Sequence, residues 1–179
     1  MSFVLAMVPT LVFAMSGGDR HAASPASQPT ITEPPDSLRV DSFYAKYVDA
    51  EGVPILSSRE VSDRALLIAR DIVTHMLSKR QDVRTKLMEN GVRVAVMSVK
   101  EVATDLPEHR DLYEAFPGID WNTRTRGVSA TFARPATSCG EENLLGMPSD
   151  RYRGESILVH EFGHTILNMA LPEIDPTPG

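Results

Sequence analysis

Residues 152–171, YRGESILVHEFGHTILNMAL, predict one long apolar helix that ends before Pro172. Residues 160–164 form an HExxH motif, and outside that motif no charged residue occurs between Glu155 and Glu173. Four residues make slightly more than one helical turn, so the two histidines of the motif project from the same face. We expect such a helix to pack behind a buried metal site.

The HExxH motif supplies the groups of a zinc hydrolase. His160 and His164 can bind one Zn²⁺ at about 2.0–2.1 Å, and Glu161 lies about 100° further round the helix. There it can take a proton from a metal-activated water that attacks a carbonyl. We therefore expect zinc-dependent hydrolysis of peptide bonds, with Glu161 as general base. Gly163 costs about 1 kcal/mol relative to alanine inside a helix, so it predicts a close approach by another backbone.

The surroundings of the motif resemble a known group of enzymes. Residues 154–166, GESILVHEFGHTI, are similar to the active-site helix of zincin metallopeptidases, and HEFGH is the form found in the anthrax lethal factor family. The resemblance is confined to this segment. It implies His160 and His164 as zinc ligands, Glu161 as general base, and a gluzincin-like domain that acts on a peptide or protein.

A third zinc ligand is not evident after the motif. Metzincins continue as HExxHxxGxxH, but Leu167 and Ala170 stand at the glycine and last histidine positions, which excludes that subclass. Gluzincins usually take a glutamate from a later helix, and the proline-rich residues 172–179 cannot form one. We therefore expect a truncated domain with an incomplete metal site. The remaining candidates, each with a geometric difficulty, are Cys139, Glu141, Glu142, His109 (in a segment typical of a surface), Glu173 and Asp175.

Two alternatives stay open. Peptide deformylases combine a cysteine with HExxH, so another zinc hydrolase with Cys139 as third ligand is one, although the glycine-rich segments of deformylases have no counterpart here. A buried Cys139 is the simpler interpretation. The other alternative is a catalytically inactive, truncated module that binds a partner without zinc.

The order of the remaining elements predicts an α+β fold in which the active-site helix packs on a small mixed sheet. Apolar periodicity and turn residues favour a hairpin at 44–56, helices at 58–79, 82–89 and 107–116, and strands at 92–99 and 127–132. Ser58 or Ser62 is expected to cap the first helix, and Gly91 to end the second. The strand at 127–132 is the candidate edge for binding an extended peptide. Arg124 and Arg126 nearby are either substrate contacts or ordinary surface charge.

The N-terminal residues indicate export. Residues 3–15 (FVLAMVPTLVFAM) are almost wholly apolar but shorter than the about 20 residues that span a bilayer, which favours a signal peptide at 1–23. Residues 24–37 contain four prolines and predict a linker, so the metallopeptidase-like domain is expected at 38–179. The net charge of −6, with scattered lysines and arginines, gives no sign of a nucleic-acid surface or a membrane patch. We expect a periplasmic or extracellular protein.

Overall fold

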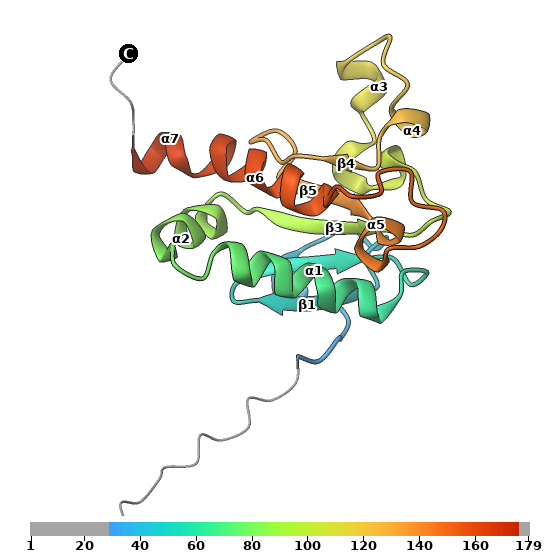
Figure 1. The fold of residues 1–179 in the computed structure, drawn as a ribbon. Coiled ribbons are helices and arrows are strands. Elements are labelled where there is room, and N and C mark those ends of the chain that lie inside the picture. The colour runs from blue at the N-terminus through green and yellow to red at the C-terminus, as the bar shows by residue number, and fades with distance from the viewer. Residues whose placement is uncertain (1–28, 176–179) are drawn as a thin grey trace, which may run out of the picture.

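A computed structural model describes residues 29–175 of the 179-residue chain, so the predicted signal peptide lies outside the described residues. The architecture is α+β, with a five-stranded mixed sheet of strand order β1-β2-β3-β5-β4 (Figure 1). This confirms the expected fold class. Part of the predicted linker belongs to the fold, because Thr32 exchanges backbone hydrogen bonds with Tyr47.

The first two strands form the predicted hairpin. β1 (Lys46–Ala50) and β2 (Val53–Ser57) pair antiparallel, with Ala50 opposite Val53. Glu51 and Gly52 between them both have positive φ, 55° and 101°. Two such residues are what a two-residue turn between twisted strands requires.

Three parallel strands make the centre of the sheet. β3 (Arg93–Met97) pairs with β2 on one side and with β5 (Ala136–Gly140) on the other. β4 (Gly127–Val128) is an antiparallel edge strand beside β5. It is shorter than the predicted 127–132, because residues 131–134 form a turn closed by hydrogen bonds between Thr131 and Arg134.

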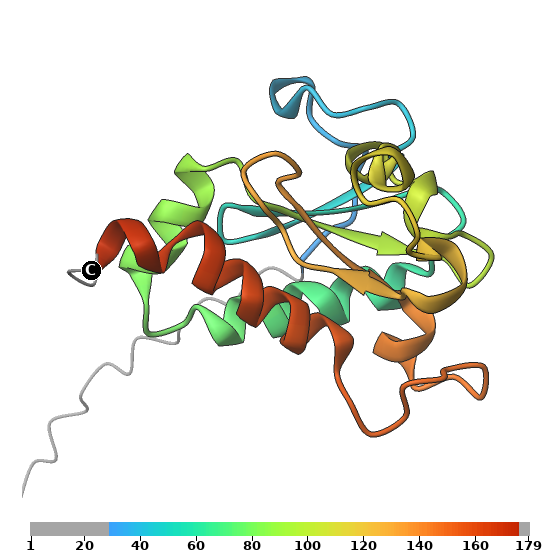
Figure 2. The ribbon, with the colours of Figure 1, turned by 90° about the horizontal axis from the view of Figure 1, so that it is seen from above.

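The long helices cover one face of the sheet. α1 (Asp63–Met76), α2 (Gln81–Glu89), α5 (Glu141–Leu145), α6 (Ile157–Met169) and α7 (Leu171–Ile174) contribute to this layer. Figure 2 shows α1 and α6 on one side of the sheet, with the first part of the described chain, drawn in blue, on the other. The predicted helices at 58–79 and 82–89 are confirmed. Ser62 is the N-cap residue of α1 without a side-chain capping bond, and Gly91 follows α2 with φ 67°.

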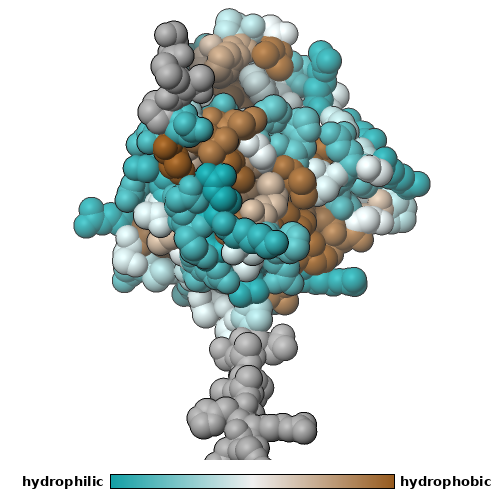
Figure 3. All heavy atoms as spheres, turned by 60° about the vertical axis from the view of Figure 1, so that its left-hand side comes forward, coloured by the Kyte–Doolittle hydropathy of each residue, from teal (hydrophilic) through white to brown (hydrophobic). Residues whose placement is uncertain are grey.

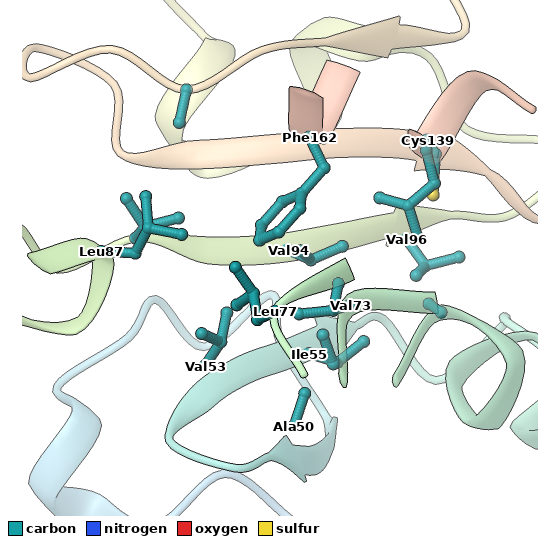
Figure 4. Close-up of a cluster of buried hydrophobic side chains, with 14 of the residues drawn as sticks. Ala50, Val53, Ile55, Val73, Leu77, Leu87, Val94, Val96, Cys139 and Phe162 are labelled. Carbon is teal, nitrogen blue, oxygen red and sulfur yellow. The ribbon is translucent and has the colours of Figure 1, made fainter. Parts of the chain in front are cut away.

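The main core lies between these helices and the sheet. Phe162 of α6 is fully buried and points toward Val94 of β3, close to Val73 and Leu77 at the end of α1 (Figure 4). A Phe→Ala change at such a position typically costs about 3–5 kcal/mol of stability. Phe162 therefore holds the middle of α6 against the sheet.

The opposite face carries a smaller core under short elements. Tyr44, Leu56, Ala95, Met97 and Leu106 are its buried members. The predicted helix at 107–116 is divided into a 3-10 helix and a short α-helix, because Asp111 between them leaves the helical conformation (φ −92°, ψ 4°). The short elements of this region are 3-10 helices at Asp36–Leu38, Ala103–Asp105 and Pro107–His109, with α3 (Leu112–Ala115) and α4 (Trp121–Arg124).

The end of the molecule formed by α2 and α7 keeps some apolar side chains partly exposed. Figure 3 shows apolar areas separated by hydrophilic atoms at this end. Met76, Leu171 and Ile174 are partly buried apolar residues that pack against the main core. Within residues 29–175, no helix has the length and apolar character needed to cross a membrane.

Candidate metal centre

The helix that carries the motif, α6, begins at Ile157 and not at the predicted Tyr152. Gly154, with a positive φ of 91°, is not helical and precedes α6. The Ser156 side chain then caps the helix by accepting a hydrogen bond from the Val159 N–H. Asn143 of α5 fixes the same turn from both sides. Its amide accepts from the Ile157 N–H at 2.9 Å and donates to the Glu155 carbonyl at 2.9 Å. The first turn of α6 is therefore held by α5.

The helix ends at Met169 rather than continuing to Leu171. Ala170 leaves the helical conformation (φ −131°, ψ −53°), and Pro172 lies in the first turn of the short α7. Proline suits that position because the first turn of a helix needs no backbone donor.

The two histidines lie side by side on the exposed face of α6. The ring centroids of His160 and His164 are 4.8 Å apart with an interplanar angle of 72°. The Glu155 carboxylate approaches the other side of the first ring, with Oε1 3.4 Å from His160 Nδ1. Two neighbouring imidazoles accessible to solvent suit one Zn²⁺, because neutral imidazole nitrogens are among its preferred ligands.

Glu161 lies deeper than the histidines. Its side chain is partly buried between α6 and β4, and burial raises the pKa of its carboxyl above the ordinary value, opposed by the neighbouring His160 and His164. The Ser129 N–H also faces this carboxylate and lowers its pKa. A carboxylate with a raised pKa accepts a proton more readily near neutral pH.

A shallow pocket of about 200 Å³ opens beside these residues. His160 and Glu161 line it together with Arg124, Tyr152 and Ile157. The Tyr152 hydroxyl donates to the Arg124 carbonyl at 2.6 Å, which closes one side of the pocket. Within the described part of the chain the Arg124 guanidinium forms no ion pair, which fits both predicted roles of Arg124, substrate contact and ordinary surface charge.

Arg126 has different surroundings from Arg124. It is buried and paired with Glu142, with Nε 2.5 Å from Oε1 and Nη2 2.8 Å from Oε2. It also donates to the carbonyls of Glu101 and Ser98. The interpretation of Arg126 as ordinary surface charge is wrong, because the residue is buried and its guanidinium is bonded to groups from distant parts of the chain.

Residues 137–143 support the centre, which the sequence did not indicate. Thr137 Oγ1 lies 2.6 Å from Thr165 Oγ1 of α6. Glu141 accepts from the N–H groups of Ser62 and Val99, which joins the loops that follow β2 and β3. With the Glu142 and Asn143 contacts, this segment ties α6 to the sheet.

The predicted close approach of a backbone at Gly163 is not observed. A Cβ placed at Gly163 meets no heavy atom within 4 Å outside its own helix. The close approach occurs instead at Gly127 of β4, where a Cβ would lie 2.9 Å from Glu161 Cγ. The residue pattern of α6 could not predict this approach, because the approaching backbone belongs to another element, β4.

The proposed third ligands do not reach the histidines. Cys139 is fully buried in the core on β5 (Figure 4), and burial raises the pKa of its thiol. His109 is also fully buried, contrary to the surface position expected for it, with Nε2 3.3 Å from the Ala136 carbonyl. Glu173 contacts Asn90 and Lys86, and Asp175 is exposed beyond the end of α7.

Glu141 and Glu142 are engaged in the bonds described above, so none of the six candidates completes the site. No group of three histidine, cysteine, aspartate or glutamate side chains within residues 29–175 is arranged to hold a metal ion. Of the residues predicted for a metal site, the described part of the chain therefore brings together only His160, His164 and Glu161.

Comparisons with protein-family models, with curated proteins and with solved structures find no match for this chain.

Proposed function

We propose that this protein is a zinc-dependent peptidase of the zincin type, in which His160 and His164 hold the metal and Glu161 is the general base. The observation that carries the proposal is the arrangement on α6: two solvent-accessible imidazoles with ring centroids 4.8 Å apart, next to a partly buried carboxylate. α6 packs on one face of the mixed sheet against β5 and the edge strand β4, which is the setting expected for such a site.

The proposed hydrolysis needs a Lewis acid and a general base. Bound zinc supplies a Lewis acid that acidifies water and polarises the peptide carbonyl. Glu161 accepts the proton of the attacking water and passes it to the leaving amine, a task that its raised pKa suits. Ser129 and the pocket wall limit the movement of the Glu161 side chain.

The edge strand β4 offers a binding mode for the substrate. Its pairing partner β5 lies on one side, and within the described residues its other edge has no strand beside it. An extended peptide can add to such an edge through main-chain hydrogen bonds. It would then run past Glu161, with one side chain in the pocket lined by Arg124 and Tyr152.

Zinc analysis and a peptidase assay on matched variants test the proposal. Glu161→Gln should keep the zinc content and lower the rate of hydrolysis about 10²–10⁴-fold, the usual contribution of a general base. His160→Ala should lose the metal and the activity. His75→Ala, which removes an exposed histidine from α1, is the control and should change neither. Hydrolysis at the parental rate by Glu161→Gln would show that the mechanism is wrong.

The alternatives make different predictions for the same proteins. A zinc hydrolase with Cys139 as ligand requires a thiol near the histidines, and its buried position does not favour that. A zinc-free binding module would contain no metal in either the parental protein or the Glu161→Gln variant.

A further inference from the structure

At position 127, β4 lies closer to α6 than a residue with a side chain would allow. Gly127 pairs with Cys139, whose side chain points into the core beneath α6, so position 127 faces the same helix. A Cβ built there would overlap Ile157 Cγ2, and would lie 2.9 Å from Glu161 Cγ and 3.0 Å from the Ser138 carbonyl oxygen. The missing side chain is what lets the strand touch the Glu161 side chain.

This approach is fixed on both sides of Gly127. The preceding residue, Arg126, is held by its buried bonds to Glu142 and to two backbone carbonyls. Three residues later, the Ala130 N–H donates to Thr165 Oγ1 of α6 at 2.9 Å. β4 cannot move away without breaking one of these anchors, so a larger residue at 127 must displace the Ile157 side chain, the Glu161 side chain or α6 as a whole.

We infer that Gly127 is a positioning residue for Glu161, because its bare backbone forms the wall that sets where the carboxylate lies relative to the histidines. The inference rests on the proposed function. A general base must lie within about 2.6–3.2 Å of the proton that it takes. A misplacement of about 1 Å is enough to lower a rate about 100-fold.

Gly127→Ala tests the inference by three measurements: zinc affinity, steady-state kinetics and thermal unfolding. The three atoms nearest to the added methyl belong to Ile157, Glu161 and Ser138 and not to a histidine, so zinc affinity should stay at the parental value. We expect kcat to fall about 100-fold with little change in KM, together with a lower melting temperature. Gly163→Ala adds the same methyl to α6 where no heavy atom lies within 4 Å, and it should lose no stability.

The double variant Gly127→Ala/Ile157→Leu separates positioning from packing. Leucine has no Cγ2 branch at Cβ, so it relieves the overlap with Ile157 but leaves the contact with Glu161. Relative to Ile157→Leu alone, we expect the double variant to recover most of the lost stability while kcat stays low. Recovery of kcat together with stability would show that Gly127 only packs, and would overturn the inference.

A failure of the proposed function can be distinguished from a failure of the inference about Gly127. If the parental protein hydrolyses no peptide, the peptidase proposal fails. A crystal structure of the Gly127→Ala variant then tests, without any activity measurement, whether Gly127 sets the position of the Glu161 side chain. Displacement of the Glu161 side chain from its parental position supports the inference, and an unmoved Glu161 overturns it.

Discussion

Thr165 Oγ1 on α6 lies 2.6 Å from Thr137 Oγ1 on β5, in the buried layer between helix and sheet. A hydroxyl has one proton, and Thr165 donates its own to the Glu161 carbonyl at 3.0 Å. Thr137 must therefore be the donor of the shared bond, while the Ala130 N–H gives Thr165 a second one. The Thr165 side chain thus joins α6 to β5 and to the segment that follows β4.

Thr165→Val should destabilise the protein by about 1–3 kcal/mol for each group left without a partner. Valine has nearly the same shape but cannot accept from the Ala130 N–H or from Thr137. Urea unfolding of the parental and variant proteins measures the difference.

Adding Thr137→Val to the Thr165→Val protein should be stabilising, because it removes one of the two unpaired groups. Thr137→Val alone should cost less than Thr165→Val. A double variant less stable than Thr165→Val would contradict this hydrogen-bond scheme.

Glu155→Gln should weaken zinc binding, with an expected loss of about tenfold. Its carboxylate lies 3.4 Å from His160 Nδ1, which leaves Nε2 of that ring for the metal. Carboxylates that bond the second nitrogen of a metal-binding histidine typically contribute about 10–100-fold to affinity. The expected loss is at the lower end because both side chains are about half exposed, 50% and 55%. Competition with a chromogenic chelator gives the dissociation constants.

Glu60→Gln is the control for this measurement, since it removes an exposed carboxylate from the loop before α1. It should bind zinc like the parental protein. Equal affinity of Glu155→Gln and Glu60→Gln would rule out a role for Glu155 at His160.

Cys139 should not react with thiol reagents in the folded protein. It is fully buried, and burial raises the pKa of its thiol, so the reactive thiolate is scarce at neutral pH. We expect one thiol to be titrated in guanidinium and none in buffer. Cys139→Ser should also keep the parental zinc content, whereas loss of zinc would favour the cysteine-ligand alternative.

In the metal-free protein, Glu161 should lower the stability of the folded state by an amount that depends on pH. Burial raises the pKa of this carboxyl in the folded state, so its contribution to stability is present below the unfolded pKa, about 4.3, and is lost as pH rises through the folded pKa. Metal-free Glu161→Gln should therefore gain stability relative to the parental protein as pH rises from 4 toward 7. Chemical denaturation after chelator treatment measures this gap, and a gap that widens toward acid pH would contradict the assignment.

The sequence by itself determined the local elements and the position of the HExxH motif on its helix. Helical periodicity located α1 and α2, β-branched alternation located β3, and the glycines at 52 and 91 marked two chain reversals through their left-handed conformations. The spacing of His160 and His164 was sufficient to place both on one face of α6, because a helix repeats every 3.6 residues. These features depend on residues close together in the chain.

Only the tertiary structure decided which distant residues surround that motif. β5, ATSCG, has no apolar pattern, yet all five of its residues are buried because helices cover one face and short elements the other. Arg126 and Glu142 lie 16 residues apart in the chain, and their pairing turned an expected surface arginine into an internal anchor of β4. The contact of Gly127 with Glu161 likewise exists only because the edge strand and α6 pack together. Such contacts depend on the packing of elements remote in sequence, which no periodicity encodes.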